Sequence, residues 1–283
     1  MIIECVPNVS EGRDLAAVDR IAAAVPAGLL LDCSSDPDHN RSVLTLAGGP
    51  EAVAEAAFQL VRTAVGLIDL RRHDGVHPRT GASDVLPFVP VSGITLQECA
   101  VLARKVGQRI WDELQVPVYL YEAAAVRPAC RRLENIRRGG LEPDIGTGRH
   151  ISAGACVVGA RKFLIALNIL LRTENLALAK RIAGTIREAS GGLPGVKALG
   201  LPLPSQGGVQ VSMNVVDFEA TPLRAIYRAV EQLSRAAGVE VAGTELIGLI
   251  PRAALEGGGG KDIKWLNLRE DSVLENRLDC GGA

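Results

Sequence analysis

Residues 208–218, with the sequence GVQVSMNVVDF, decide the fold because their pattern is that of a strand with one buried face. Apolar side chains occupy every second position of this stretch, and a period of two is typical of a half-buried β-strand. The alternating apolar residues are Val209, Val211, Met213 and Val215. A single strand cannot bury its apolar face alone, so the neighbouring segments must supply its partners.

The flanking segments supply strands and helices in a regular order. A strand is predicted at 163–168 (FLIALN), followed by a helix that starts near Thr173 and Glu174 and by a strand at 196–201. After the 208–218 strand, Thr221 and Pro222 are a good N-cap and first-turn pair for a further helix. With a last strand at 246–250, this half has the order β-α-β-β-α-β, which is that of a ferredoxin-like unit.

The first half repeats this order and then adds elements. Its predicted strands are Ile2 to Val6, Leu29 to Cys33, Ser42 to Ala47, Val85 to Val89 and Val118 to Tyr121. Its predicted helices run from about Arg13 to Val25, from Pro50 to about Leu67 and from Thr95 to about Leu114, the last opening with the capping box TLQE. We therefore predict an α+β fold of two ferredoxin-like (βαββαβ-type) subdomains, the first with extra elements, at 1–162 and 163–283. A glycine-rich tail begins at about residue 257.

Composition narrows the class of protein. The chain has 283 residues, 47% of them hydrophobic and 22% charged, which indicates a globular protein with ample core material. A net charge of −1 and 3% aromatic residues argue against a nucleic-acid-binding module. Without a signal peptide or an apolar run long enough to span a membrane, we expect a cytoplasmic protein with no membrane partner.

Two polar segments carry the groups suited to catalysis. RHDGVHPRTGASD, residues 72–84, combines imidazoles, guanidinium groups and a carboxylate in one short stretch. DPDHNR, residues 36–41, lies between two predicted strands and has a similar content, although an ordinary hydrophilic hairpin would also explain it. Because imidazole titrates near neutral pH, the histidines of these segments are candidate proton carriers.

Other kinds of site are less well supported. The six cysteines lack the paired spacing of a zinc or thioredoxin-like site, and no helix-spaced pair of histidines lies on a clear helix, so we expect no metal. The basic stretch 127–140 is predicted to be a solvated helix face, with a landing site for a polyanionic substrate tail as the alternative.

Several motifs together resemble one enzyme family, the glutamate formimidoyltransferases. They are ECVPNVSEGRD at 4–14, DPDHNRSV at 36–43, HPRTGASDVLPFVPV at 77–91 and GARKFLIALN at 159–168. The resemblance spans roughly residues 2–255. It implies transfer of a formimidoyl group from N-formimidoyl-L-glutamate to N5 of the co-substrate tetrahydrofolate, a late step of histidine degradation. It also implies a homodimer and a separate cyclodeaminase that completes the pathway.

The resemblance also implies roles for particular residues. His77, in the HPR motif, matches the catalytic histidine. The folate-binding stretch matches Gly146, Thr147, Gly148, Arg149, His150, Ile151, Ser152, Ala153 and Gly154.

For the donor we expect Arg41 and Arg79 to bind carboxylates and Asn40 to hold the amidine or an amide, while Asp84 or His39 orients the imidazole of His77. A pKa of His77 close to the working pH would suit a group that acts first as a base and then as an acid. His73 is either a second participant or a turn residue.

Besides a metal hydrolase, for which His39, His73, His77 and nearby aspartates would have to converge in space, two alternatives remain open at the level of sequence. Ser34 and Ala153 stand where the animal relatives have Asp and Trp, which leaves room for an enzyme acting on a related one-carbon folate such as 5-formyltetrahydrofolate. A non-catalytic folate-binding or sensor protein is the other, because a fold does not fix a function.

Overall fold

The structure, a computed structural model, describes residues 1–256, 264–268 and 270–280. The chain forms two compact units, Met1–Lys162 and Phe163–Ala283, each with its own sheet and core. The fold is therefore α+β, as predicted. Residues 257–263, with which the predicted glycine-rich tail begins, lie outside the described residues.

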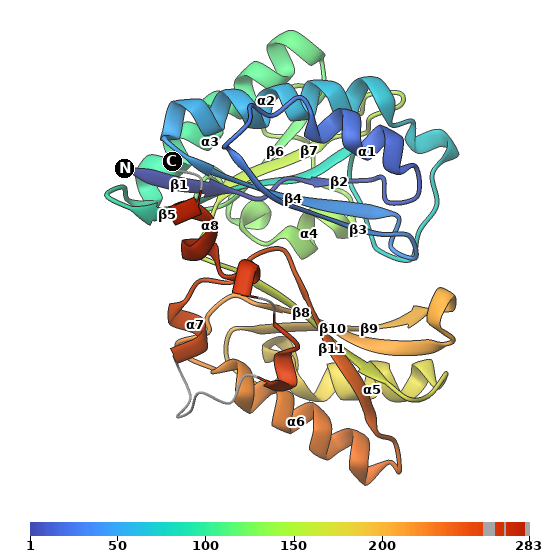
Figure 1. Cartoon of the computed structure of the whole chain (residues 1–283). Helices are drawn as coiled ribbons and strands as arrows, with labels where there is room; N and C mark the ends of the chain where they lie inside the picture. Colours follow the sequence, from blue (N-terminus) through green and yellow to red (C-terminus); the bar gives the residue numbers. More distant parts are fainter. Residues whose placement is uncertain (257–263, 269, 281–283) are drawn as a thin grey trace. The chain divides into compact units, whose positions relative to one another are not determined.

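The first unit is built on a seven-stranded sheet (Figure 1). Its strands are β1 (Ile2–Cys5), β2 (Asn8–Val9), β3 (Leu30–Asp36), β4 (Arg41–Gly48), β5 (Ser83–Ser92), β6 (Val118–Glu122) and β7 (Cys156–Ala160). β1 and β2 both lie between β4 and β5 and pair antiparallel with them, while β3 pairs with the other edge of β4. β7 adds a parallel strand next to β5, and β6 pairs parallel with β7.

Three helices cover one face of this sheet, as Figure 1 shows: α1 (Leu15–Ala22), α2 (Pro50–Leu67) and α3 (Leu96–Leu114). Their apolar sides and the facing strand residues form the main core, which includes Phe58, Phe88 and Leu86 with no exposed surface. The predicted capping box is confirmed at α3, where Thr95 Oγ1 accepts from the Glu98 N–H at 3.2 Å and Glu98 Oε2 accepts from the Thr95 N–H at 2.8 Å.

The opposite face carries a smaller apolar cluster under the short helix α4 (Leu133–Arg138). Tyr119 and Tyr121 of β6 and Val157 of β7 pack there against Cys130 and Ile136. β7 was not predicted from the sequence, whereas α4 lies within the basic stretch 127–140 that was predicted to be helical. β7 has the composition of a strand, but its sequence CVVGA is short and shows no alternation, because both faces of a central strand are buried.

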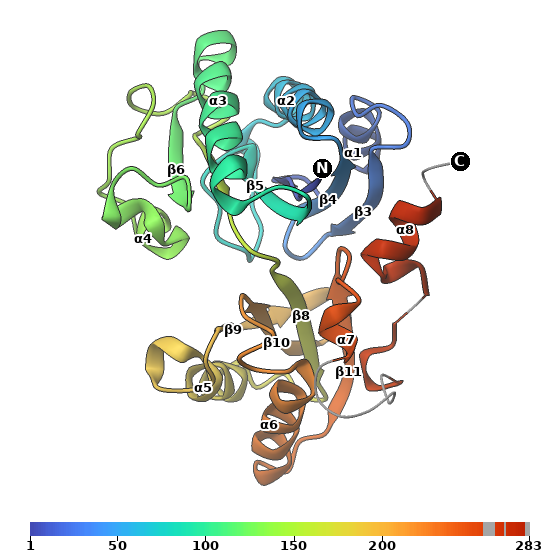
Figure 2. The same cartoon turned by 90° about the vertical axis from the view of Figure 1, so that its left-hand side faces the viewer.

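The second unit has a four-stranded antiparallel sheet with strand order β11-β8-β10-β9 (Figure 2). The strands are β8 (Ile165–Leu171), β9 (Val196–Leu203), β10 (Gly208–Val215) and β11 (Val241–Ile247), and the helices α5 (Leu176–Ile186) and α6 (Leu223–Ala236) pack on one face. The alternation that predicted β10 is confirmed: its four alternating apolar residues are all buried in this core. Four short helical segments follow in the described part of the chain: α7 (Ala253–Glu256), the 3-10 helices η5 (Lys264–Leu266) and η6 (Glu270–Ser272), and α8 (Leu274–Cys280).

Two local predictions are wrong. Thr221 does not cap α6, since its Oγ1 donates to the Pro194 carbonyl at 2.7 Å and the helix begins after Pro222 without a side-chain cap. The apolar pattern of 13–25 also predicts that Leu15 shares the buried face of α1 with Val18 and Ile21. This is wrong, because 57% of the Leu15 surface is exposed at the first turn, where Asp14 caps the helix.

Candidate active site

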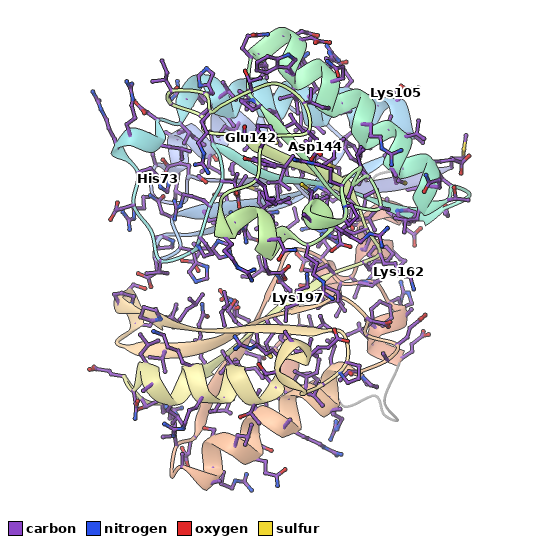
Figure 3. The ribbon with its side chains drawn as sticks, turned by 180° about the vertical axis from the view of Figure 1, so that it is seen from behind. His73, Lys105, Glu142, Asp144, Lys162 and Lys197 are labelled. Atoms are coloured by element: carbon purple, nitrogen blue, oxygen red, sulfur yellow. The ribbon has the colours of Figure 1, made fainter. Side chains whose placement is uncertain are left out.

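The two polar segments identified in the sequence lie together in the first unit. The chain between β3 and β4, residues 37–40, contacts the segment that joins η1 (Leu70–Arg72) to β5 through several hydrogen bonds. The Val76 N–H donates to the Asp38 carbonyl at 3.2 Å, and Asn40 Nδ2 donates to the Asp74 carbonyl at 2.9 Å. Figure 3 labels His73 on the segment that follows η1.

His77 lies where these segments meet. Its ring centroid is 5.6 Å from that of His39, and its Nδ1 is 2.7 Å from the Pro78 carbonyl oxygen. A carbonyl oxygen can only accept a hydrogen bond, so Nδ1 carries the hydrogen and the lone pair of the neutral ring is on Nε2. The side chain therefore presents Nε2 as a proton acceptor.

The electrostatic surroundings keep this imidazole neutral. Burial first, and then the positive charges of Arg41 and Arg137, lower the pKa of His77 far below its ordinary value, and the negative charge of Asp84 offsets this only in part. The expectation of a pKa near the working pH is therefore wrong for the protein without substrate. His77 is ready to accept a proton, but it is a weak base until the neighbouring positive charge is compensated.

Among the described residues, Asp84 has no hydrogen bond to the imidazole of His77, unlike a typical orienting carboxylate; its hydrogen bonds go to other groups. The carboxylate has no exposed surface, and its Oδ2 accepts from Arg41 Nη1 and from Arg137 Nη2, both at 2.6 Å. Its Oδ1 accepts from the Thr80 N–H at 2.5 Å. Although burial alone would raise it, these positive charges and the Thr80 hydrogen bond hold the pKa of Asp84 well below its usual range, so the group is an anion.

Arg41 is a buried residue with its guanidinium held from two sides. Besides the ion pair with Asp84, Nε and Nη2 both donate to Asn8 Oδ1, at 3.1 and 2.8 Å. The side chain is thus fixed at the start of β4. It contributes a positive charge that acts on His77.

Arg79 and Asn40 join the two segments instead of presenting free groups to a substrate. Arg79 Nη2 donates to the carbonyls of His39 and His77, at 3.1 and 2.9 Å, and Nη1 donates to the ring of His73. Asn40 accepts from the Gly12 N–H at 2.9 Å and donates to the Asp74 carbonyl. From the sequence, Arg79 was expected to bind a carboxylate and Asn40 to hold the amidine, whereas in the structure both side chains form hydrogen bonds to backbone groups. A sequence shows which side chains are polar, but it does not show which of them bond to the backbone.

His39 and His73 have supporting positions. His39 is buried, and its Nδ1 is 3.5 Å from Asp36 Oδ2. Its contact with His77 is between the two rings. Burial and the charge of Arg79 lower the pKa of His73, which favours the neutral ring that accepts from Arg79.

The stretch 146–154 reaches the same place in the fold. The Ala82 N–H donates to the Ala153 carbonyl at 2.9 Å, and the Ala155 N–H donates to the Thr80 carbonyl at 3.2 Å. His150 and Gly154 close a tight turn by pairing their backbones, and Ile151, at the tip of this turn, is 81% exposed. The predicted folate segment is therefore attached by backbone hydrogen bonds to the segment that follows His77.

Gly81 and Gly154 allow this close approach. A Cβ at Gly81 would lie 2.1 Å from the Ala155 carbonyl oxygen, and one at Gly154, where φ is +69°, would lie 2.5 Å from the Thr80 carbonyl oxygen. Both positions have backbone atoms as neighbours, which cannot move aside as a flexible side chain can. The contact between the two segments requires glycine at both.

We expect Gly154→Ala to lower the free energy of unfolding by about 1–3 kcal/mol, from left-handed backbone strain and the contact with Thr80. The control is Gly148→Ala, at φ +67° but with no atom within 4 Å of the added Cβ, so that only the backbone term remains. Chemical denaturation of both variants measures the difference. Equal losses would mean that the contact with Thr80 is relieved without cost.

Arg137 and Asn8 are the residues that sequence reasoning missed. Arg137 belongs to the basic stretch 127–140, in which Arg131, Arg132 and Arg138 are exposed as predicted and Arg127 is half-buried and paired with Asp144. Arg137 instead turns inward to Asp84. A signal existed in ASDVLPFVPV: an aspartate at the head of an apolar strand needs a cation partner. Nothing in the sequence shows which arginine supplies it.

Among the described residues, no group of three or more His, Cys, Asp or Glu side chains has the arrangement to hold a metal ion. No helix in the described part of the chain is long and apolar enough to cross a membrane.

Comparison with known proteins identifies similar chains. The family model for the formiminotransferase domain, N-terminal subdomain, matches residues 2–161, and that for the formiminotransferase domain matches residues 166–262. A glutamate formimidoyltransferase of Streptococcus pyogenes serotype M1 is 44% identical over 270 residues, which are 90% of each chain. One of Thermoplasma acidophilum is 38% identical over 98% of this chain and 97% of its own. The formimidoyltransferase-cyclodeaminase of Rattus norvegicus is 42% identical over 90% of this chain but only 51% of its own, longer chain.

Proposed function

The chain belongs to the formiminotransferase family, and from this premise we propose that it transfers the formimidoyl group of N-formimidoyl-L-glutamate to N5 of tetrahydrofolate. The observation that carries the mechanism is the hydrogen bond between His77 Nδ1 and the Pro78 carbonyl, which leaves the lone pair on Nε2. His77 is the general base and then the general acid of the transfer.

The proton balance of the reaction fits one such group. As N5 of tetrahydrofolate attacks the formimidoyl carbon, a bond forms there and the amine nitrogen must lose a proton, which Nε2 of His77 accepts. When the bond from that carbon to the glutamate nitrogen breaks, the imidazolium returns the proton to the leaving nitrogen. The ring is neutral at the end, as it was at the start, and a single residue serves both steps.

The surroundings of His77 suit an anionic donor. N-formimidoyl-L-glutamate has two carboxylates, and Arg41 supplies a fixed guanidinium beside the imidazole. Arg79, Asn40, His39 and Asp84 act by holding the segments and charges in place. Tetrahydrofolate is assigned to the stretch Gly146–Gly154, whose backbone attachment to Thr80 and Ala82 would keep the acceptor close to His77.

The strand order supports a ferredoxin-like assignment for each unit. In the second unit the order β11-β8-β10-β9 follows β-α-β-β-α-β connectivity, and in the first unit β3, β4, β1 with β2, and β5 have the corresponding arrangement before α3, β6 and β7 are added. The homodimer, the cytoplasmic location and the separate cyclodeaminase stay predictions.

The direct test is an assay of the purified protein with N-formimidoyl-L-glutamate and tetrahydrofolate, followed by the appearance of 5-formimidoyltetrahydrofolate. 5-Formyltetrahydrofolate is the comparison substrate. Turnover with formimidoylglutamate that exceeds turnover with 5-formyltetrahydrofolate supports the proposal. If the protein binds folate but turns over neither compound, the proposed activity is wrong and the protein is a non-catalytic folate-binding protein.

The pH dependence of the reaction should reflect the lowered pKa of His77. At saturating tetrahydrofolate, the profile of kcat/KM for the donor reports the enzyme before the donor binds, in which His77 must be neutral to act as a base. Because its folded pKa is lowered, protonation of His77 should not reduce kcat/KM between pH 7 and the ordinary histidine value near 6.5, nor for some distance below it. A steady-state profile measured at saturating tetrahydrofolate tests this. An acid limb centred at the ordinary value would contradict the electrostatic description of the site.

A further inference from the structure

Arg137 is largely buried, although it belongs to the basic stretch 127–140 that was predicted to face solvent. It comes from α4, on the face of the sheet opposite the three large helices, and its side chain is only 17% exposed. Nη2 donates to Asp84 Oδ2 at 2.6 Å, whereas Nε is buried and has no hydrogen-bond partner among the described residues. A buried guanidinium N–H without a partner is unfavourable, and a bound acceptor would satisfy it.

The charges in this cluster do not balance. Arg41 and Arg137 both bond to Asp84, so two guanidinium groups share one carboxylate. Arginine keeps its charge in proteins, and the other partner of Arg41, Asn8, is neutral. The cluster therefore has one positive charge more than its carboxylate compensates, and this charge lies close enough to His77 to act on its protonation.

We propose that Arg137 is a binding residue for a carboxylate of the donor, and that Asp84 is the positioning residue that aims Arg137 and Arg41 toward it. The inference rests on the proposed function and deepens it by naming the cation that receives the donor. A carboxylate suits the site because it supplies one negative charge and accepts from Nε and from a second guanidinium N–H in parallel.

The same arrangement links donor binding to the chemistry of His77. Without donor, burial and, after it, the charges of the two arginines lower the pKa of His77, so that the imidazole is neutral and weakly basic. A donor carboxylate that compensates their excess charge makes protonation of His77 easier, because a nearby negative charge favours the imidazolium. Donor binding and proton uptake at His77 therefore strengthen each other, and the base gains its strength only when there is a donor to act on.

The test compares Arg137→Met with Arg138→Met. Arg138 lies one residue further along α4, is exposed and carries the same charge, so its replacement controls for the loss of one positive charge from the protein. Binding of N-formimidoyl-L-glutamate is measured by calorimetry without tetrahydrofolate, so that no transfer occurs. We expect the affinity to fall about 10- to 100-fold for Arg137→Met, from the loss of charged hydrogen bonds, and less than about twofold for Arg138→Met.

A second measurement detects an effect that a purely structural role would not produce. The ring signals of His77 are assigned by NMR from the spectrum of His77→Gln, among only four histidines. In the wild-type protein, N-formimidoyl-L-glutamate should raise the pKa of His77. In Arg137→Met without donor, the pKa of His77 should already be higher than in the wild type, and the donor should raise it less.

Arg137→Lys distinguishes a loss of donor binding from a folding defect, because the lysine keeps the positive charge that pairs with Asp84. It should unfold like the wild type and bind the donor with intermediate affinity, since an ammonium lacks the planar fork of the guanidinium. Unchanged donor affinity in Arg137→Met, or equal losses in Arg137→Met and Arg138→Met, would overturn the inference. Donor binding with the expected pKa shifts but no transfer to tetrahydrofolate would instead overturn the proposed function and leave the anion site standing.

Discussion

His77→Ala is expected to lower kcat by about two to four orders of magnitude, the usual contribution of a positioned general acid and base. The reason is local: Nε2 is the proton acceptor that the Pro78 hydrogen bond leaves available, and an alanine methyl group cannot move a proton. Steady-state kinetics with both substrates measures the loss. KM for the donor should change less than kcat, because Arg41 and Arg137 stay in place.

The fold of the His77→Ala variant should be preserved. The side chain donates a hydrogen bond to the carbonyl of the adjacent Pro78, while the backbone carbonyl of His77 accepts from Arg79, which in turn reaches the distant His39 carbonyl. Thermal unfolding should therefore be close to that of the wild type. A variant that unfolds normally and retains more than a tenth of the wild-type kcat would remove His77 from the mechanism.

The elements of the fold were the most accessible part from sequence. The apolar alternation of β10 and the capping box of α3 are local patterns, and both are confirmed because tertiary contacts act in the same direction as local preference. β7 was missed since it depends on contacts with segments far away in the chain, and the sequence predicted a helix in 127–140 without showing that it is confined to Leu133–Arg138. A short central strand has no polar face to mark it, and a six-residue helix has too few turns to show a period.

For the candidate site, sequence located the segments more reliably than the contacts of each side chain. Both polar segments and the 146–154 stretch come together, although they are far apart in the chain. Arg79 and Asn40 were expected to touch substrate, yet their polar groups bind backbone carbonyls and amides. The number of backbone groups that a loop leaves unsatisfied depends on its path, and only the folded chain reveals it.

Asp84→Asn should lower the free energy of unfolding by about 3–5 kcal/mol, the usual effect of removing one partner from a buried ion pair. The carboxylate is completely buried, and its replacement by a neutral amide leaves Arg41 and Arg137 without a compensating charge. Urea denaturation at pH 7 measures the change. The matched control is Asp74→Asn, whose side chain is 85% exposed and pairs with Arg13, and which should lose less than about 1 kcal/mol.

The pH dependence of this difference identifies its cause. Because the folded pKa of Asp84 is lowered, its stabilising effect is present above the unfolded value of about 3.9 and is lost as the pH falls from there toward the folded value. The wild type and Asp84→Asn should therefore converge in stability as the pH is lowered from 5 toward 2, whereas the wild type and Asp74→Asn should differ little throughout. A large loss for Asp84→Asn that stays constant over this range would mean that packing at the head of β5, and not the charge of the carboxylate, is what Asp84 contributes.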